Sequence, residues 1–169
     1  MPAILNLNKI VMSFIHLTTF IAAPQQRVFD LSRSVDVHKY SMTGYQEQIV
    51  KGTMSGLMAL NDEVTWKARH LFRERVLRVK ITELKQPDYF ADEQLEGDFK
   101  FMKHEHYFMP AENGTIMIDQ FRYKTKKGWL GQLFSQFYLD KYMTRLLTER
   151  NHMIKKLAES NQWKQFLEK

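Results

Sequence analysis

The sequence predicts one α+β domain, residues 1–169 with a core at about 12–158, in which a curved antiparallel sheet wraps around a long C-terminal helix. Two observations predict it. Apolar and polar residues alternate with a period of two from about residue 56 to residue 124, which is typical of strands with one buried face. From residue 128 to residue 160 the apolar residues recur at helical spacing instead. We expect six to seven strands, with two short helices after the first.

The composition excludes several classes of protein. The chain has no cysteine, which excludes disulfides, thiolate nucleophiles and cysteine-based zinc sites and fits the reducing cytoplasm, where we expect the protein to reside. The net charge is +6, but Lys and Arg are dispersed among Asp and Glu without a dense basic block. We therefore predict no nucleic-acid partner.

The first strand is expected at about residues 14–21. In an extended chain Ile15, Leu17 and Ile21 share one side, and Phe14, His16 and Phe20 share the other. The sides are almost equally apolar, so the pattern does not say which way His16 points. The apolar run is too short to span a bilayer, and we predict no stable membrane insertion. Residues 1–11 add little to the pattern, which makes Met12 a candidate for the true start.

Two short helices follow. Pro24 stands where a helix can begin, and the residues after it supply a short apolar face. A second helix is expected from Ser34 to about Met42. Gly44, Gly52 and Gly56 then indicate a looped stretch.

The sheet continues with five further strands. Two have clear faces, with Val64, Trp66, Ala68 and His70 on one side of the first and Leu77, Val79 and Ile81 on one side of the second. A third runs near residues 89–95, where Asp92 and Glu93 blur the faces. A hairpin then joins residues 99–109 to residues 115–124, with Asn113-Gly114 as the turn signal.

The last helix is expected over residues 128–160. Its apolar arc is wider near Leu130, Leu133, Phe134 and Phe137, so we expect its first turns to be the more buried end. Its basic residues are expected on a solvated face; they are Lys141, Arg145, Arg150, Lys155 and Lys156.

With its elements in this order, the chain resembles the START-related helix-grip superfamily, also called SRPBCC or polyketide cyclase-like. The resemblance begins with residues 14–16 and continues through "IAAP" at 21–24 and "RVFD" at 27–30. The segments "NDEVTWKA", "GDFKFMKHEH" and "TIMIDQFRY", at residues 61–68, 97–106 and 115–123, are similar to an uncharacterised ligand-binding bacterial branch.

The resemblance implies a cavity between sheet and last helix. Relatives include lipid carriers, hormone receptors, aromatic polyketide cyclases and co-chaperone domains, so membership implies a cavity more firmly than a reaction. We expect the partner to be a small apolar or amphipathic molecule, lipid-like or polyketide-like. The alternatives are a cyclase- or dehydratase-like enzyme using the same cavity, and a co-chaperone-like module that binds proteins through the convex sheet face. The oligomeric state stays open.

The hairpin carries the candidate polar site. A tight connection would set Phe108 opposite Thr115, and counting back from there places His104 near Asp119. His104, His106 and Asp119 could bind a metal, do acid–base chemistry, or simply hydrogen-bond each other in the core. The sequence does not decide whether a reaction occurs, and we predict no catalytic residue, no metal and no cofactor.

The expected ligand-binding residues come from both sides of the predicted cavity, and each could instead fill the core. They are Trp66, His70, Met102, His104, His106, Phe108, Met117, Asp119, Phe121, Tyr123, Phe137 and Met143. No phosphate-binding G-x-x-x-x-G-K loop, G-x-S-x-G nucleophile elbow or H-E-x-x-H metal motif occurs.

Overall fold

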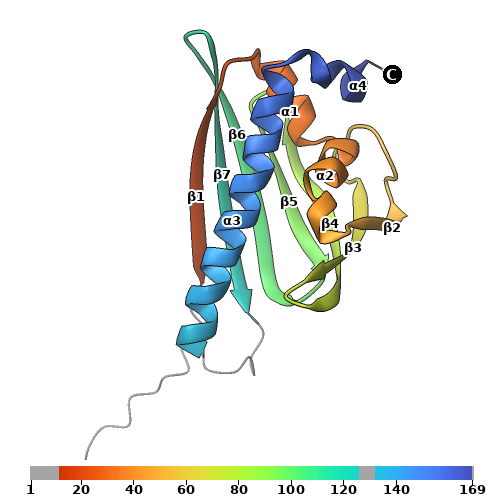
Figure 1. Cartoon of the computed structure of the whole chain (residues 1–169), viewed down its shortest axis with the longest axis vertical. Helices are drawn as coiled ribbons and strands as arrows, with labels where there is room; N and C mark the ends of the chain where they lie inside the picture. Colours follow the sequence, from red (N-terminus) through yellow and green to blue (C-terminus); the bar gives the residue numbers. More distant parts are fainter. Residues whose placement is uncertain (1–11, 126–131, 169) are drawn as a thin grey trace, which may run out of the picture.

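The computed structural model describes residues 12–125 and 132–168. Seven antiparallel strands form one sheet in the order β1-β7-β6-β5-β4-β3-β2, which curves around the long helix α3 (Figure 1). The strands are β1 Ser13–Ile21, β2 Gln48–Gly52, β3 Glu63–His70, β4 Arg73–Lys85, β5 Tyr89–Glu96, β6 Phe99–Ala111 and β7 Gly114–Thr125. This is the helix-grip fold, so the predicted fold class is confirmed.

The apolar residues of β1 point to both faces of the sheet. Ile15 and Ile21 are buried, whereas Phe14, His16 and Phe20 are exposed on the other side. His16 therefore points away from the space between sheet and helix. β1 pairs with β7 along its whole length, with Ile15 opposite Phe121.

The two short helices form where they are predicted. α1 spans Gln25–Ser32 after Pro24, and α2 spans Val35–Ser41. The Ser34 hydroxyl caps α2 by accepting the Val37 N–H at 3.3 Å. A 3₁₀ turn, η1, follows at Thr43–Tyr45.

The stretch predicted to be looped contains an additional strand. β2 pairs with β3 at the edge of the sheet. Its residues are mostly exposed, so burial imposes no alternation that the sequence could reveal. Gly52 ends it with φ +92°, and a Cβ there would lie 2.1 Å from the Glu63 carbonyl oxygen.

The hairpin register differs from the prediction by two residues. Phe108 lies opposite Met117 rather than Thr115, because only Glu112 and Asn113 separate the paired ends of β6 and β7. Asn113 adopts the positive φ of 61° that such a tight turn needs. A shift of two residues leaves every side chain on its predicted face.

The structure differs from the prediction for α3 at Phe137. α3 spans Gln132–Ala158, and Leu130 and the side chains of Leu133 and Phe134 fall outside the described parts. Phe137 is 65% exposed, whereas Leu157 and Ala158 at the other end are completely buried. The reason is that α1 and α2 pack against the later turns of α3 (Figure 1). After α3 come a 3₁₀ turn, η2 Asn161–Trp163, and α4 Lys164–Leu167.

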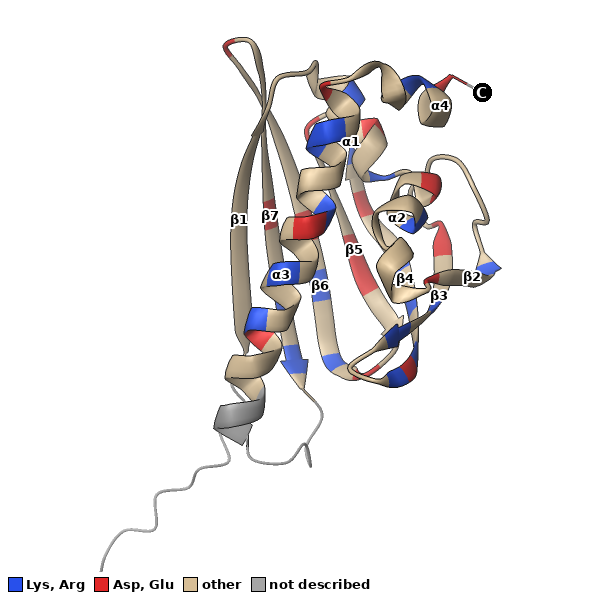
Figure 2. Cartoon of the chain, in the orientation of Figure 1, with Lys and Arg blue, Asp and Glu red and all other residues tan. Residues whose placement is uncertain are grey.

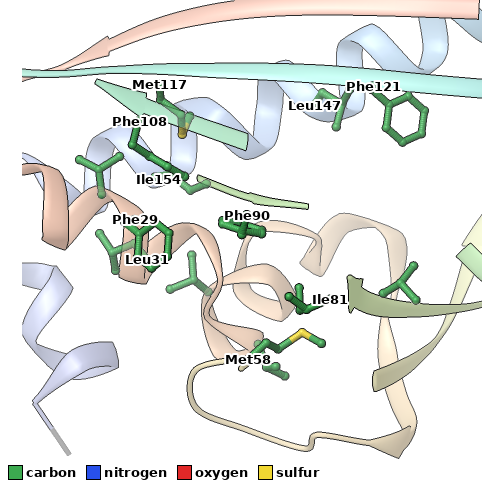
Figure 3. Close-up of a cluster of buried hydrophobic side chains, with 14 of the residues drawn as sticks. Phe29, Leu31, Met58, Ile81, Phe90, Phe108, Met117, Phe121, Leu147 and Ile154 are labelled. Atoms are coloured by element: carbon green, nitrogen blue, oxygen red, sulfur yellow. The ribbon is translucent and has the colours of Figure 1, made fainter. Parts of the chain in front are cut away.

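The core lies between the sheet and these helices. Figure 3 shows Phe29 and Leu31 of α1 packed toward Phe90 and Phe108 of the sheet, with Ile154 of α3 nearby. Phe29 meets the ring of Phe108 edge-on, with 5.3 Å between centroids. This packing anchors the late part of α3.

The charged residues are mixed in sign over the visible side of the molecule (Figure 2). On the outer face of the sheet, Lys67 pairs with Glu74 and Arg78 pairs with Glu63. Among the described helices, none is both long and apolar enough to cross a membrane.

Candidate functional site

A cavity of about 170 Å³ lies between the sheet, α2 and α3. Most of its wall is apolar, from residues such as Trp66, Val79 and Phe121 on the strands and Leu147 on the helix. Polar groups gather on one part of the wall: Ser32, Ser34, Asp92, His104, His106 and Arg150. We call this space the polar compartment.

A second space of about 130 Å³ shares walls with the first, including Trp66, His70 and Met143. We call it the apolar compartment. Leu71, Leu139 and Tyr142 line it without lining the polar compartment. Its polar contacts include a hydrogen bond of 2.8 Å between His70 Nδ1 and the Tyr142 hydroxyl, and an ion pair between Arg75 and Asp98. Burial lowers the pKa of His70.

The strand register builds the polar wall from two adjacent rows of side chains. In one row Phe90, His106 and Asp119 stand side by side across β5, β6 and β7. In the next row the order is Asp92, His104 and Phe121. Each imidazole therefore lies between an aromatic ring and a carboxylate, and each carboxylate is diagonal to the other imidazole.

Asp119 is the centre of this cluster and is completely buried. Its Oδ1 is 2.9 Å from His104 Nε2 and 2.8 Å from His106 Nδ1. Its Oδ2 accepts a hydrogen bond of 2.6 Å from the Asn151 amide, and Arg150 Nη1 lies 3.6 Å from Oδ1. A single carboxylate thus links two strand histidines to two consecutive residues of α3.

The rest of the cluster is anchored from outside. His106 Nε2 lies 3.2 Å from Asp92 Oδ2, and Arg150 Nη2 donates to the Ser32 carbonyl oxygen at 2.8 Å. Two nitrogens remain without an aligned hydrogen bond, His106 Nδ1 and Arg150 Nη1, although both lie near Asp119. Such atoms are costly to bury and are uncommon in a site that is purely structural.

Burial and charge set the ionisation of the cluster. Burial, reinforced by the neighbouring His106, lowers the pKa of His104 to about 4, so its ring is neutral at pH 7. Burial alone would raise the pKa of Asp119, but its contacts with His104 and His106 outweigh burial and hold that pKa well below the usual range. The same opposition, with His106 as the hydrogen-bond donor, lowers the pKa of Asp92.

Aromatic rings hold both imidazoles in place. The ring of Phe90 stacks on His106 with 4.1 Å between centroids and 22° between planes. Phe121 meets His104 edge-on, at 5.2 Å and 89°. Because the rings restrict rotation, the imidazole nitrogens keep fixed directions toward the carboxylates.

The predicted site residues divide into three groups. Seven line the compartments: Trp66, His70, Met102, His104, His106, Phe121 and Met143. Four are buried on the predicted face without lining either compartment: Phe108, Met117, Asp119 and Tyr123. The structure places Phe137 on the surface, beneath the ammonium group of Lys141 at 4.5 Å, so its predicted position in the cavity is wrong.

Sequence reasoning missed Asp92, Asn151 and Arg150. Asp92 was set aside because acidic neighbours blur its strand, although it shares a face with buried Phe90. Arg150 was expected in solvent and is only 6% exposed. Its signal was its spacing from Leu147 and Ile154, which places it on the apolar stripe of α3.

Two kinds of chemistry are open to the polar wall. The neutral His104 next to an ionised carboxylate has the form of an oriented general base. Asp92, His104 and His106 each offer a donor atom, and these atoms lie within 4.8 Å of one another, a distance that suits a candidate metal site.

Solved structures share the fold of this chain. The Zhui aromatase/cyclase from Streptomyces sp. R1128 superposes with a TM-score of 0.73 at 15% identity, covering 88% of this chain and 94% of its own. The di-domain aromatase/cyclase StfQ of the steffimycin biosynthetic pathway gives 0.68 at 12% identity, covering 88% of this chain and 51% of its own. Major latex-like protein 151 from Panax ginseng gives 0.62 at 14%, covering 88% and 99%.

These similarities confirm the helix-grip fold of START-related proteins that the resemblance implied. No family model matches the sequence. No curated protein matches it either.

Proposed function

We propose that this protein binds one small, largely apolar molecule that carries a hydrogen-bonding group at one end. The observation that carries the proposal is the pair of adjoining compartments, one apolar and one with a buried polar wall. The fold shared with two proteins named as aromatase/cyclases supports it, because such a name implies a small-molecule substrate in those proteins.

The compartment volumes bound the size of the ligand. An apolar cavity of about 150 Å³ accepts one benzene molecule, so each compartment has room for about one ring. A molecule of two fused or linked rings would fill both. Burying about 200 Å² of its apolar surface would contribute about 5 kcal/mol of favourable transfer free energy before the entropic cost of association.

The polar wall favours a hydroxyl group over a carboxylate at the ligand's end. Asp92 and Asp119 are ionised acceptors, and the neutral ring of His104 can accept or donate one hydrogen bond. A ligand carboxylate would face two carboxylates, with the Arg150 guanidinium already held by Ser32 and Asp119. Phenols and alcohols therefore fit the wall best.

A cavity-filling pair of variants tests the proposal. Met143 lines both compartments, so Met143→Trp should weaken binding of the neutral fluorescent probe 2-naphthol at least about 10-fold. Phe137→Trp adds an indole on the same helix outside the cavity and should leave that affinity unchanged. Equal effects of the two variants, or no 2-naphthol binding to the wild type, would contradict the proposal.

One observation favours a second candidate, an acid–base enzyme acting on the bound molecule. A neutral imidazole, His104, lies on the cavity wall with Asp119 behind it. If so, a phenolic precursor incubated with the protein in D₂O should lose water or exchange carbon-bound hydrogen for deuterium, which mass spectrometry would detect. His104→Gln should slow that reaction about 10²- to 10⁴-fold and change probe affinity little. Unchanged turnover in this variant would exclude His104 as the base.

A further inference from the structure

We propose that Asp92, His104 and His106 bind one divalent transition-metal ion, with Zn²⁺ as the best fit, on the wall of the polar compartment. This inference goes beyond ligand binding and departs from the expectation of no metal that the sequence suggested. It rests on the donor set: two imidazoles and one carboxylate suit zinc and its neighbours rather than Mg²⁺ or Ca²⁺, which prefer oxygen ligands.

The separations of the donor atoms fit a single ion. Around a tetrahedral Zn²⁺ with bonds of about 2.0–2.1 Å, neighbouring ligand atoms lie about 3.4 Å apart. His106 Nε2 and Asp92 Oδ2 are 3.2 Å apart, close to that edge. The donor atom of His104 lies within 4.8 Å of both, which is wider than that edge, so binding of the ion has to draw the three donors closer together.

Asp119 has the position of an outer-shell carboxylate. Metal-bound histidines usually direct their second ring nitrogen to a carboxylate, which orients the ring. Asp119 Oδ1 lies 2.9 Å from His104 Nε2 and 2.8 Å from His106 Nδ1, so it contacts one nitrogen of each ring and leaves the other available. Buried Asn151 in turn holds the second oxygen of Asp119 at 2.6 Å. A simple hydrogen-bonded pair in a core would not require one carboxylate to serve two histidines.

The surroundings fix this arrangement and leave one side open. Phe90 and Phe121 pack on the two imidazoles, and Arg150 near Asp119 offsets the charge of that carboxylate. Asp92, His104 and His106 all line the polar compartment. Three protein ligands would therefore leave a fourth position directed at the cavity, as in catalytic rather than structural zinc sites.

Metal titration of the full, untagged chain tests the proposal. After removal of metal with EDTA, Zn²⁺ is added in a calorimeter, and Co²⁺ is added in parallel as a spectroscopic probe. We expect one ion per chain and the intense visible absorption of tetrahedral Co²⁺. Asp92→Asn should weaken Zn²⁺ binding by more than the about 10- to 100-fold that Asp119→Asn costs as an outer-shell change.

The matched control is the double variant His16→Gln/His152→Gln, which removes two exposed histidines and should bind as the wild type does. Far-UV circular dichroism confirms that each variant is folded, and Asp92, whose side chain is 17% exposed, is the least buried of the three proposed ligands. The proposal is overturned if the wild type binds no ion, if Asp92→Asn binds as tightly as the wild type, or if only the double variant loses binding. Probe binding by the metal-free protein is measured separately, so either proposal can fail alone.

Discussion

The two compartments of the cavity are built by opposite means. The wall of the polar compartment contains three charged or imidazole side chains within hydrogen-bonding or ion-pair distance of one buried carboxylate, that of Asp119; they are His104, His106 and Arg150. The apolar compartment is lined mainly by apolar side chains such as Leu71, Leu139 and Leu146, and its polar contacts include the hydrogen bond between His70 and Tyr142 and the ion pair between Arg75 and Asp98. The compartments share Trp66 and Met143, so the contrast arises within about one side-chain length.

This difference between the compartments suits them to different roles in ligand binding. Apolar burial is nondirectional and scales with area, so the apolar compartment can supply affinity without selecting an orientation. Buried polar groups are directional and expensive when unpaired, so the polar compartment selects which end of a ligand enters it. A network with several members also makes each member hard to remove.

The largest loss of stability is therefore expected when Asp119 is substituted. Asp119→Ala would leave His104, Arg150 and Asn151 buried without their common partner. Breaking such a buried charged network costs about 3–5 kcal/mol of unfolding free energy. Urea unfolding at pH 7 measures it.

The control for this experiment is Glu96→Ala, at an exposed position at the end of β5, which should change the unfolding free energy by less than about 0.5 kcal/mol. A loss below about 1 kcal/mol for Asp119→Ala would mean that water replaces the carboxylate. The polar network would then contribute little to stability, and the two compartments would not differ in this respect.

The second effect is the pH dependence of stability, which arises mainly from His104 in the polar compartment; His70, whose pKa is also lowered by burial, adds to it in the same direction. The folded protein holds the pKa of His104 at about 4, below its value of 6.5 in the unfolded chain. Between these values the unfolded state binds the extra proton, so stability is fully present above pH 6.5 and falls as pH drops toward 4. The contribution of His104 amounts to about 3 kcal/mol. Urea midpoints measured from pH 7 to pH 4 follow it.

In His104→Gln this part of the pH dependence should disappear, while exposed His152→Gln should keep it. The lowered pKa values of Asp92 and Asp119 act below this window, because their unfolded values lie near 3.8. Parallel curves for His104→Gln and the wild type would show that the imidazole is not held neutral.

The sequence predicted the strands and helices and their buried faces more completely than the members of the polar cluster. Period-two alternation is a property of each strand alone and does not depend on how strands pair. The inward faces of the hairpin, including His104 and Asp119, were therefore predicted correctly despite the register shift of two residues. The end of α3 that is buried depends on where α1 and α2 pack. Local periodicity contains no information about that, and the prediction for Phe137 was wrong.

The missed members of the cluster share a physical reason. Asp92 and Arg150 are charged, and charged residues are rarely buried unless paired, so composition argues for solvent at both positions. Their partners come from different elements, with Asp92 facing β6 and Arg150 reaching α1. Only the assembled sheet and helix reveal the pairing that makes burial acceptable.

The smallest loss of stability is expected for a substitution in the apolar compartment. Tyr142→Phe removes the hydroxyl that bonds His70 Nδ1 at 2.8 Å and keeps the ring that lines the wall. Both side chains are partly exposed, so water can replace the lost partner, and the cost should be about 1 kcal/mol or less. The pH dependence between 6.5 and 4 should keep the slope that His104 gives it. A loss of 3 kcal/mol or more in urea unfolding would place a second buried polar network here, because a single solvent-accessible hydrogen bond cannot account for it.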